Sequence, residues 1–444
     1  MFWLELLVVV AALLIGTRIG GFGLGVIGGI GLTILVFVFG VQPTSPPIDV
    51  ILMITAVVTA ASVLEAAGGL DYLVALAAYV LRKNPKHVTY LAPFITWLAA
   101  VFAGSAHVSY SLLPVIAEVA RKTGIRPERP LSVSVVAASM AMTSSPISPA
   151  TMALFSLVGP LGVQFFDIMK INIPAHVIGL LVIAAVASRM GKDLSKDEAY
   201  QERVRQGLSA PVDAADNLDS TDFSHIPTTA KASVAIFLAG TTLVVLLGSF
   251  AELRPSWVVN EKTIRMNMPN TIQMLMLSIA GIIMLVAKVK PKQVVSGMVF
   301  PAGIQAVIAI FGIAWMVDSF FSFNLPMLRG GIGDMVKNAP WTFAIALAAL
   351  GGVLYSQGAT VRALVPLGIS LGISPIYLVA MLPAANNLFI IPNYPTALAA
   401  IGFDRTGSTG IGKYLLNHSF IVPGLLALVV NTVAAFFLMY VFFG

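Results

Sequence analysis

Two Pro-x-x-Pro motifs lie inside long apolar segments, one in each half of the chain. The first runs from Pro146 to Pro149, and the second from Pro392 to Pro395. Such a pair interrupts a regular helix, because each proline lacks an N–H donor and its ring clashes with the preceding turn. In lipid, a break of this kind is tolerated only where it is buried in protein or lines a watery cavity. Matching breaks in two halves of a chain point to the binding site of a transporter.

The composition indicates a membrane protein. The chain has 444 residues, of which 58% are hydrophobic and only 10% are charged, whereas soluble proteins average about 25% charged residues. Apolar runs such as 231–250, 271–287 and 420–443 reach the length of about 20 residues that spans hydrocarbon. We therefore predict an all-α polytopic membrane protein.

The residue types argue against an enzyme and against bound cofactors. The chain has no cysteine, which excludes disulfides, thiolate metal sites and cysteine nucleophiles. No metal-ligand cluster, Walker lysine or nucleophile–base pair is legible. The net charge of +6 needs no nucleic acid, because inner loops of membrane proteins carry excess Lys and Arg. The glycines between Gly21 and Gly31 predict close helix packing through small residues, and not a dinucleotide loop.

We predict ten spans and two shorter apolar hairpins. The first repeat, 1–190, holds spans at 2–16, 19–40, 49–67, 131–158 and 171–190, with a hairpin at about 87–119. The second repeat, 231–444, holds spans at 231–250, 271–288, 293–321, 374–402 and 415–443, with a hairpin at about 340–371. The broken helices are those at 131–158 and 374–402. The acidic segment 191–230 is expected to be a cytoplasmic linker that cannot fold alone.

The distribution of basic residues predicts the orientation. With an outer N-terminus, the inner loops carry roughly three times as many Lys and Arg as the outer ones, as the positive-inside rule requires. The two hairpins then enter from opposite faces, and the two halves form inverted-topology repeats. Both termini are predicted to be periplasmic.

Polar side chains gather at the breaks and at the hairpin tips. The N–H groups and dipole of a half-helix that starts at a break suit an anion. Two breaks and two tips from opposite sides fit a ligand with an anionic group at each end. The breaks also offer Thr143, Asn386, Asn387 and Tyr394. We predict that substrate is held by Ser105, Ser144, Ser145, Ser148, Thr151, Gln357, Thr360, Asn393 and Thr396.

Two basic side chains near the hairpin tips are further candidates, each with an alternative role. His107 could donate to a carboxylate or titrate during transport, or it could be structural. Arg362 could pair with a carboxylate, or it could extend toward the outer surface. Two acidic residues, Glu65 and Asp318, are expected to end the third and eighth spans near an interface.

The chain resembles the anaerobic C4-dicarboxylate transporters of the Dcu type, DcuA and DcuB, along its whole length. The stretch Ser356–Thr360 with Arg362 is closer to DcuA. Two positions depart from the family pattern, namely Asn393 at the second break and Ser105-Ala106 at the first tip. The motifs that carry the resemblance are Gly28-Gly29-Ile30-Gly31, Ala67-Gly68-Gly69-Leu70-Asp71, Arg126-Pro127-Glu128-Arg129-Pro130, Ser145-Pro146-Ile147-Ser148, Tyr355-Ser356-Gln357, Tyr394-Pro395-Thr396, Phe403-Asp404-Arg405-Thr406-Gly407 and Asn417-His418 with Pro423-Gly424.

The resemblance implies a bacterial inner-membrane antiporter that exchanges fumarate, malate or aspartate for succinate. It also implies the ion-transporter fold, several members of which are homodimers of the elevator type. The main alternative is a cation-coupled symporter of organic anions, driven by Na⁺ or H⁺. A receptor or enzyme subunit would need a larger soluble domain than 191–230 provides, and a channel would not need inverted repeats with hairpins.

Overall fold

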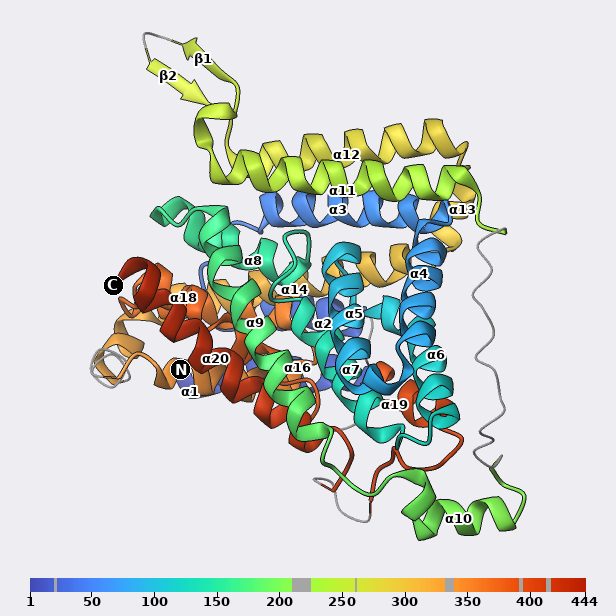
Figure 1. The fold of residues 1–444 in the computed structure, drawn as a ribbon. Helices are drawn as coiled ribbons and strands as arrows, with labels where there is room; N and C mark the ends of the chain where they lie inside the picture. Colours follow the sequence, from blue (N-terminus) through green and yellow to red (C-terminus); the bar gives the residue numbers. More distant parts are fainter. Residues whose placement is uncertain (20–21, 210–224, 260–261, 332–338, 391–393, 413–416) are drawn as a thin grey trace.

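The computed structural model describes the chain except for residues 20–21, 210–224, 260–261, 332–338, 391–393 and 413–416, and the described part is mainly helical (Figure 1). Within it, six helices are long and apolar enough to cross a membrane. They are α3 (Ile48–Ala66), α9 (Phe165–Ala187), α11 (Thr228–Ser249), α12 (Met268–Ala287), α14 (Val299–Gly331) and α20 (Ile421–Phe443).

The other four predicted spans are shorter or interrupted. The first two form α1 (Phe2–Ile19) and α2 (Gly23–Phe37). The span at 131–158 divides into α7 (Glu128–Ala141) and α8 (Pro149–Val158), with residues 142–148 outside any helix. The span at 374–402 divides into α18 (Pro375–Ala380), the short helix η6 (Leu382–Asn386) and α19 (Pro395–Phe403). Both α8 and α19 begin at the second proline of a Pro-x-x-Pro motif, where the missing N–H costs nothing.

Both predicted hairpins are pairs of packed helices. The first consists of α5 (Val88–Ala103) and α6 (Ser109–Lys122), joined through the single turn η2 (Ala106–Val108). The second consists of α16 (Thr342–Leu354) and α17 (Gln357–Ser370). In each pair the two helices contact one another along their lengths, so that the polar tips lie at the turn.

Helices from the two halves of the chain pack against each other reciprocally. Helix α2 packs on α14 and α12 packs on α3, while α8 contacts α17, α19 contacts α6, and α9 contacts α20. Glycines bring α2 and α14 close together. A Cβ atom on Gly28 would lie 2.8 Å from the carbonyl carbon of Gly312, which confirms the prediction that these glycines permit close helix packing.

The two ends of the chain lie on the same side of the molecule as the antiparallel hairpin of β1 (Ser256–Val259) and β2 (Lys262–Arg265), at the left of Figure 1. Helices α4 (Gly69–Lys83), α6 and α10 (Glu198–Arg205) lie toward the opposite side. Helix α11 runs from one side to the other. This arrangement agrees with termini that share one face of the membrane.

Residues 194–205 of the segment 191–230, which was expected not to fold alone, form η4 (Leu194–Lys196) and α10, because the carboxylate of Asp197 caps α10 and binds Arg126 elsewhere in the chain. One expectation from the sequence is wrong. Asp318 does not end its span, since α14 continues to Gly331. Helix α4 and the β1–β2 hairpin were not predicted.

Candidate functional site

A cavity of about 280 Å³ lies where the two hairpin tips and the two breaks come together. One wall consists of the tip residues 104–107 and 355–358, with Ile147, Pro149 and Tyr394 from the breaks. Most of the other lining residues are apolar and come from α3 and α14, and α14 also contributes the polar side chain of Gln305. The volume is near the lower end of the range for small-molecule pockets, about 300 Å³. We call this space the hairpin cavity.

The backbone turns in the same way at both tips. At the first tip Gly104 has φ +62°, and the extended residue Ser105 follows and accepts a hydrogen bond from the His107 N–H at 3.3 Å. At the second tip Tyr355 has φ +50°, and the extended residue Ser356 follows and accepts from the Ala359 N–H at 3.2 Å. Each left-handed residue reverses the chain, and each serine caps the helical turn that follows it.

Two helix N-termini meet beside the hairpin cavity. A Cβ atom on Gly358, at the start of α17, would lie 3.7 Å from the N atom of Ala150, at the start of α8. The first-turn N–H groups of a helix have no intrahelical acceptor, and the helix dipole places partial positive charge there. Among the described residues that line the cavity, none is Asp, Glu, Lys or Arg. The cavity can therefore offer neutral donors and helix dipoles to an anion.

Three of the predicted site residues line the hairpin cavity. They are Ser105, His107 and Gln357. The Oγ atom of Ser105 lies 3.0 Å from His107 Nδ1. The amide of Gln357 donates to Ser139 Oγ at 3.0 Å and also reaches Asn386 Oδ1 at 3.3 Å, so it links α17 to α7 and η6.

Five predicted hydroxyls are buried and bonded to protein groups. Ser144 accepts from the Trp97 indole N–H at 3.0 Å, and Ser145 donates to the Val101 carbonyl at 2.6 Å. Thr360 donates to the Ser356 carbonyl at 2.8 Å. The remaining pair is local to α8, since Ser148 donates to the Met142 carbonyl and accepts from the Thr151 N–H.

The last three predicted residues lie elsewhere. Arg362 is buried and lines a different cavity, on the side of the chain termini. Thr396 is also buried, and its Oγ1 atom has no hydrogen-bond partner. Asn393 lies outside the residues that the structure describes. Contact of these and the preceding residues with substrate stays a prediction.

A buried polar cluster ties both breaks to α9. Asn386 Nδ2 donates to Thr143 Oγ1 at 2.6 Å, and Thr143 Oγ1 lies 3.0 Å from His176 Nε2. The other ring nitrogen of His176 lies 2.5 Å from the Asn172 carbonyl. The sequence indicated Thr143 and Asn386 as polar residues at the breaks. Only the fold shows that they face each other, because they are separated by 243 positions.

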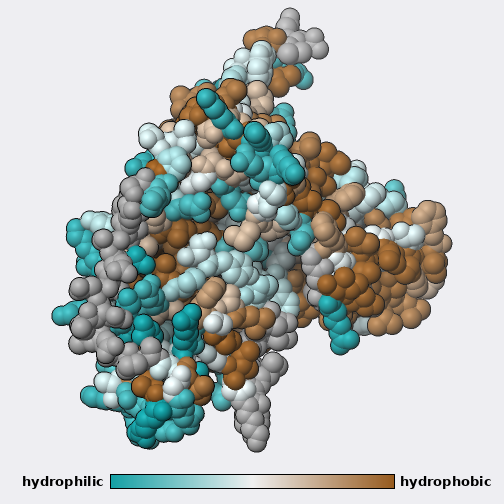
Figure 2. Space-filling view, turned by 90° about the vertical axis from the view of Figure 1, so that its right-hand side faces the viewer, coloured by the Kyte–Doolittle hydropathy of each residue, from teal (hydrophilic) through white to brown (hydrophobic). Residues whose placement is uncertain are grey.

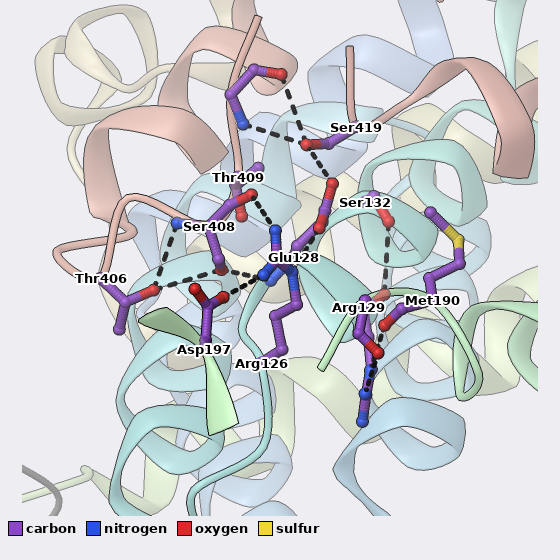
Figure 3. A network of polar contacts seen from close by, with 12 residues as sticks. Arg126, Glu128, Arg129, Ser132, Met190, Asp197, Thr406, Ser408, Thr409 and Ser419 are labelled. Carbon is purple, nitrogen blue, oxygen red and sulfur yellow. Dashed lines mark hydrogen bonds and ion pairs between the residues drawn. The ribbon is translucent and has the colours of Figure 1, made fainter. Parts of the chain in front are cut away.

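A second polar network lies at the start of α7 (Figure 3). Arg126 binds the carboxylates of Glu128, at 2.6 Å, and of Asp197, which belongs to the segment 191–230. Glu128 also accepts from Ser419 at 2.7 Å. This network therefore holds α10 and the loop before α20 against α7. Figure 2 shows the face to the right of Figure 1, where hydrophilic side chains gather at the upper centre, left and bottom, and a mainly hydrophobic lobe lies at the right.

The acidic residues expected near an interface differ in their contacts. The carboxylate of Glu65 accepts from the N–H groups of Met298 and Val299, both at 3.0 Å, and so binds the start of α14. Asp318 lies within α14 and interacts electrostatically with Arg362.

A chain with several membrane-spanning helices, two helix breaks and a buried cavity between hairpin tips has the features of a membrane transporter. Comparison with known sequences identifies it further, because the family described as "Anaerobic c4-dicarboxylate membrane transporter" matches residues 1–443. The chain belongs to this family, and its relatives are transporters and not enzymes.

Individual relatives match over almost their full length. The chain is 40% identical to the anaerobic C4-dicarboxylate transporter DcuB of Escherichia coli O6:H1 over 98% of this chain and 97% of that protein. It is also 40% identical to the C4-dicarboxylate transporter DcuA of Wolinella succinogenes over 97% of this chain and 98% of that protein. Overall identity thus does not separate the two branches.

Two solved structures have a similar fold. The YdaH transporter of Alcanivorax borkumensis superposes with a TM-score of 0.59 at 17% identity, over 94% of this chain and 89% of that chain. The MtrF protein of Neisseria gonorrhoeae gives a TM-score of 0.50 at 14% identity, over 92% of this chain and 84% of that chain.

Proposed function

We propose that the chain exchanges C4-dicarboxylates across the bacterial inner membrane, with the substrate bound in the hairpin cavity. The observation that carries the proposal is the composition of this cavity, which joins two hairpin tips and two helix N-termini and has no fixed charge among its described lining residues. Neutral donors replace the hydration of a dianion without a permanent salt bridge that would hold it. The names of the relatives supply the class of substrate, C4-dicarboxylates, and we propose fumarate, malate, aspartate and succinate as its members here.

The mechanism that fits this arrangement is alternating access of the elevator type. The moving unit comprises the two hairpins and the two broken helices, α5–α8 and α16–α19, and the scaffold comprises α2, α3, α12 and α14. Support comes from the reciprocal packing of the two halves, in which α2 contacts α14 while α12 contacts α3. Such packing is expected of two inverted repeats. We further propose periplasmic termini and a homodimer joined through the scaffold.

Exchange rather than net uptake follows if the empty carrier crosses slowly. Without substrate, the first-turn N–H groups of α8 and α17 that lack an intrahelical acceptor have no anion to bind beside the hairpin cavity, and leaving buried polar groups unpaired is costly. Bound dicarboxylate satisfies these donors and lowers the cost of moving the unit past the scaffold.

Counterflow in proteoliposomes tests the proposal. Vesicles loaded with succinate are expected to take up labelled fumarate or aspartate, whereas empty vesicles take up little. Ser356→Ala, which removes the cap of α17 at the cavity, should raise the KM. Ser249→Ala, which removes a hydroxyl on α11 bonded only within its own helix to Val245, serves as the matched control.

The competing function is cation-coupled symport. It predicts that an imposed Na⁺ or H⁺ gradient drives accumulation into empty vesicles. Equal uptake into loaded and empty vesicles would reject obligatory exchange, and absence of uptake of every C4-dicarboxylate would reject the substrate class.

A further inference from the structure

A second cavity, of about 660 Å³, lies on the side of the chain termini. It is lined by the start of α3, the end of α8, the end of α11 and the start of α12. Arg362 of α17 and Ser156 of α8 line it from the moving unit proposed above. We call this space the outer vestibule.

Arg362 is a buried cation whose hydrogen bonding is incomplete. Its side chain belongs to a residue that is only 4% exposed, its Nη1 atom reaches Ser156 Oγ at 3.4 Å, and its Nε atom has no partner. Asp318 supplies an opposite charge nearby, but its Oδ1 atom also lacks a hydrogen-bond partner. A buried guanidinium with an unused donor is costly, and a carboxylate can satisfy it with two parallel hydrogen bonds.

The rim of the vestibule also carries charge. Arg254 lines it, donates to the Met266 carbonyl at 3.2 Å, and has an Nε atom without a partner. Asp49, which is exposed in the first turn of α3, is the acidic residue among the described lining residues. The charged residues among the described lining residues are therefore the buried Arg362, the partly buried Arg254 and the exposed Asp49, which give the lining a net positive charge.

The two cavities lie along the same two helices. On α8, Pro149 and Ala150 line the hairpin cavity while Phe155 and Ser156 line the vestibule. On α17, Gln357 lines the hairpin cavity while Arg362 lines the vestibule, and five residues of helix rise about 7.5 Å. A ligand at Arg362 would thus be close to the hairpin cavity without occupying it.

We propose that the outer vestibule is a second binding site for dicarboxylates, in which one carboxylate pairs with Arg362 and Ser156. This inference rests on the proposed function, since it takes the transported dicarboxylate as the ligand. The site holds the substrate on the outer side before it enters the hairpin cavity or after it leaves.

The absence of native cysteine permits a direct test with single cysteines in the full-length protein in proteoliposomes. Val163→Cys places a thiol in the vestibule, and Ala150→Cys places one in the hairpin cavity. The probes are an anionic and a cationic methanethiosulfonate of similar size. The measured quantity is the labelling rate with and without succinate, in each case with intact Arg362 and with Arg362→Gln.

At Val163→Cys the anionic reagent should react about tenfold faster than the cationic one, the low end of electrostatic focusing in clefts. Saturating succinate should slow this labelling about tenfold. Arg362→Gln should remove both the charge preference and the protection at Val163→Cys. It should leave succinate protection at Ala150→Cys in place. If Val163→Cys does not react, Pro160→Cys at the exposed rim replaces it.

Equal rates for both reagents, or labelling that succinate does not slow, would overturn the vestibule site. Protection by chloride as strong as that by succinate would also overturn it, because the site would then bind any small anion. Normal counterflow in the same vesicles would leave the proposed function standing. Absence of counterflow with the unmodified protein, which has no cysteine, would instead reject the proposed function.

Discussion

The two hairpin tips make the same turn with different residues. Gly104 and Tyr355 both adopt left-handed backbone conformations, and a capping serine follows each. At the first tip the turn packs tightly against the break, because a Cβ atom on Gly104 would lie 3.0 Å from Ile147 Cγ1. At the second tip there is room for a tyrosine, which lines the cavity. The shared requirement is therefore the backbone reversal, while the space around it differs.

The difference indicates that the tips have unequal tasks. The first tip closes against the first break and leaves no space for a side chain at the turn. The second tip accepts a strained residue, since a left-handed conformation costs a non-glycine residue about 1–2 kcal/mol. We infer that the Tyr355 side chain is retained for its place in the cavity and not for the turn.

The largest expected effect is that of Gly104→Ala. The added Cβ atom meets both strain at φ +62° and contact with Ile147, so the tip should shift and counterflow should fall at least about tenfold, the equivalent of about 1.4 kcal/mol. Gly281→Ala on α12, where a Cβ atom meets nothing within 4 Å, is the control. Wild-type counterflow in Gly104→Ala would show that the first tip is not tightly packed during transport.

Gln357→Leu should have the next largest effect. The change leaves the Ser139 and Asn386 acceptors without their donor, and an unpaired buried group costs about 1–3 kcal/mol. Both the thermal unfolding temperature and the affinity for succinate should fall. His107→Leu at the first tip is the comparison. A larger loss of stability in His107→Leu than in Gln357→Leu would contradict the expectation that the hydrogen bonds of Gln357 matter more than those of His107.

Replacing each capping serine by alanine should reveal a smaller difference in stability between the two tips. Ser356 caps the 14-residue helix α17, whereas Ser105 caps the three-residue turn η2. Ser356→Ala should therefore destabilise the protein by about 1 kcal/mol, and Ser105→Ala by less. Thermal unfolding in the same detergent measures both, and equal shifts would contradict the ranking.

The smallest expected effect on stability is that of Tyr355→Gly. Glycine relieves the left-handed strain but gains freedom in the unfolded chain, and these terms offset each other to within about 1 kcal/mol. Tyr355→Ala keeps the strain and should unfold at a lower temperature than Tyr355→Gly. The opposite order would mean that the added freedom of glycine in the unfolded chain outweighs the left-handed strain at this position.

The breaks and hairpin tips could be predicted from the sequence because they follow from covalent features. Each of the prolines at 146, 149, 392 and 395 lacks an N–H donor and clashes with the preceding turn, so two prolines close together favour a break, and glycine with polar residues favours a turn. Which serines face a ligand could not be predicted. Ser144, Ser145 and Ser148 suit a carboxylate as well as they suit the backbone groups that they bind in the structure, and only the packing decides between the two.

Contacts between residues far apart in the chain could not be predicted from the sequence either. The position of Arg362 in the outer vestibule depends on the rotation of α17 against α8, which residue spacing does not define. The order of residues 194–205 depends on Arg126, which lies 71 positions before Asp197. A composition that is too polar to fold alone can still fold when a distant arginine binds it.

The reciprocal contact of α2 with α14 and of α12 with α3 has a consequence for biosynthesis. When the ribosome has completed the first half, the surfaces of α2 and α3 that contact α14 and α12 are still uncovered, because α12 and α14 have not yet been synthesised. Neither half can reach its final packing alone, so the insertion machinery must accommodate an open intermediate. Expressed as two separate polypeptides, the halves should be degraded singly and recovered together.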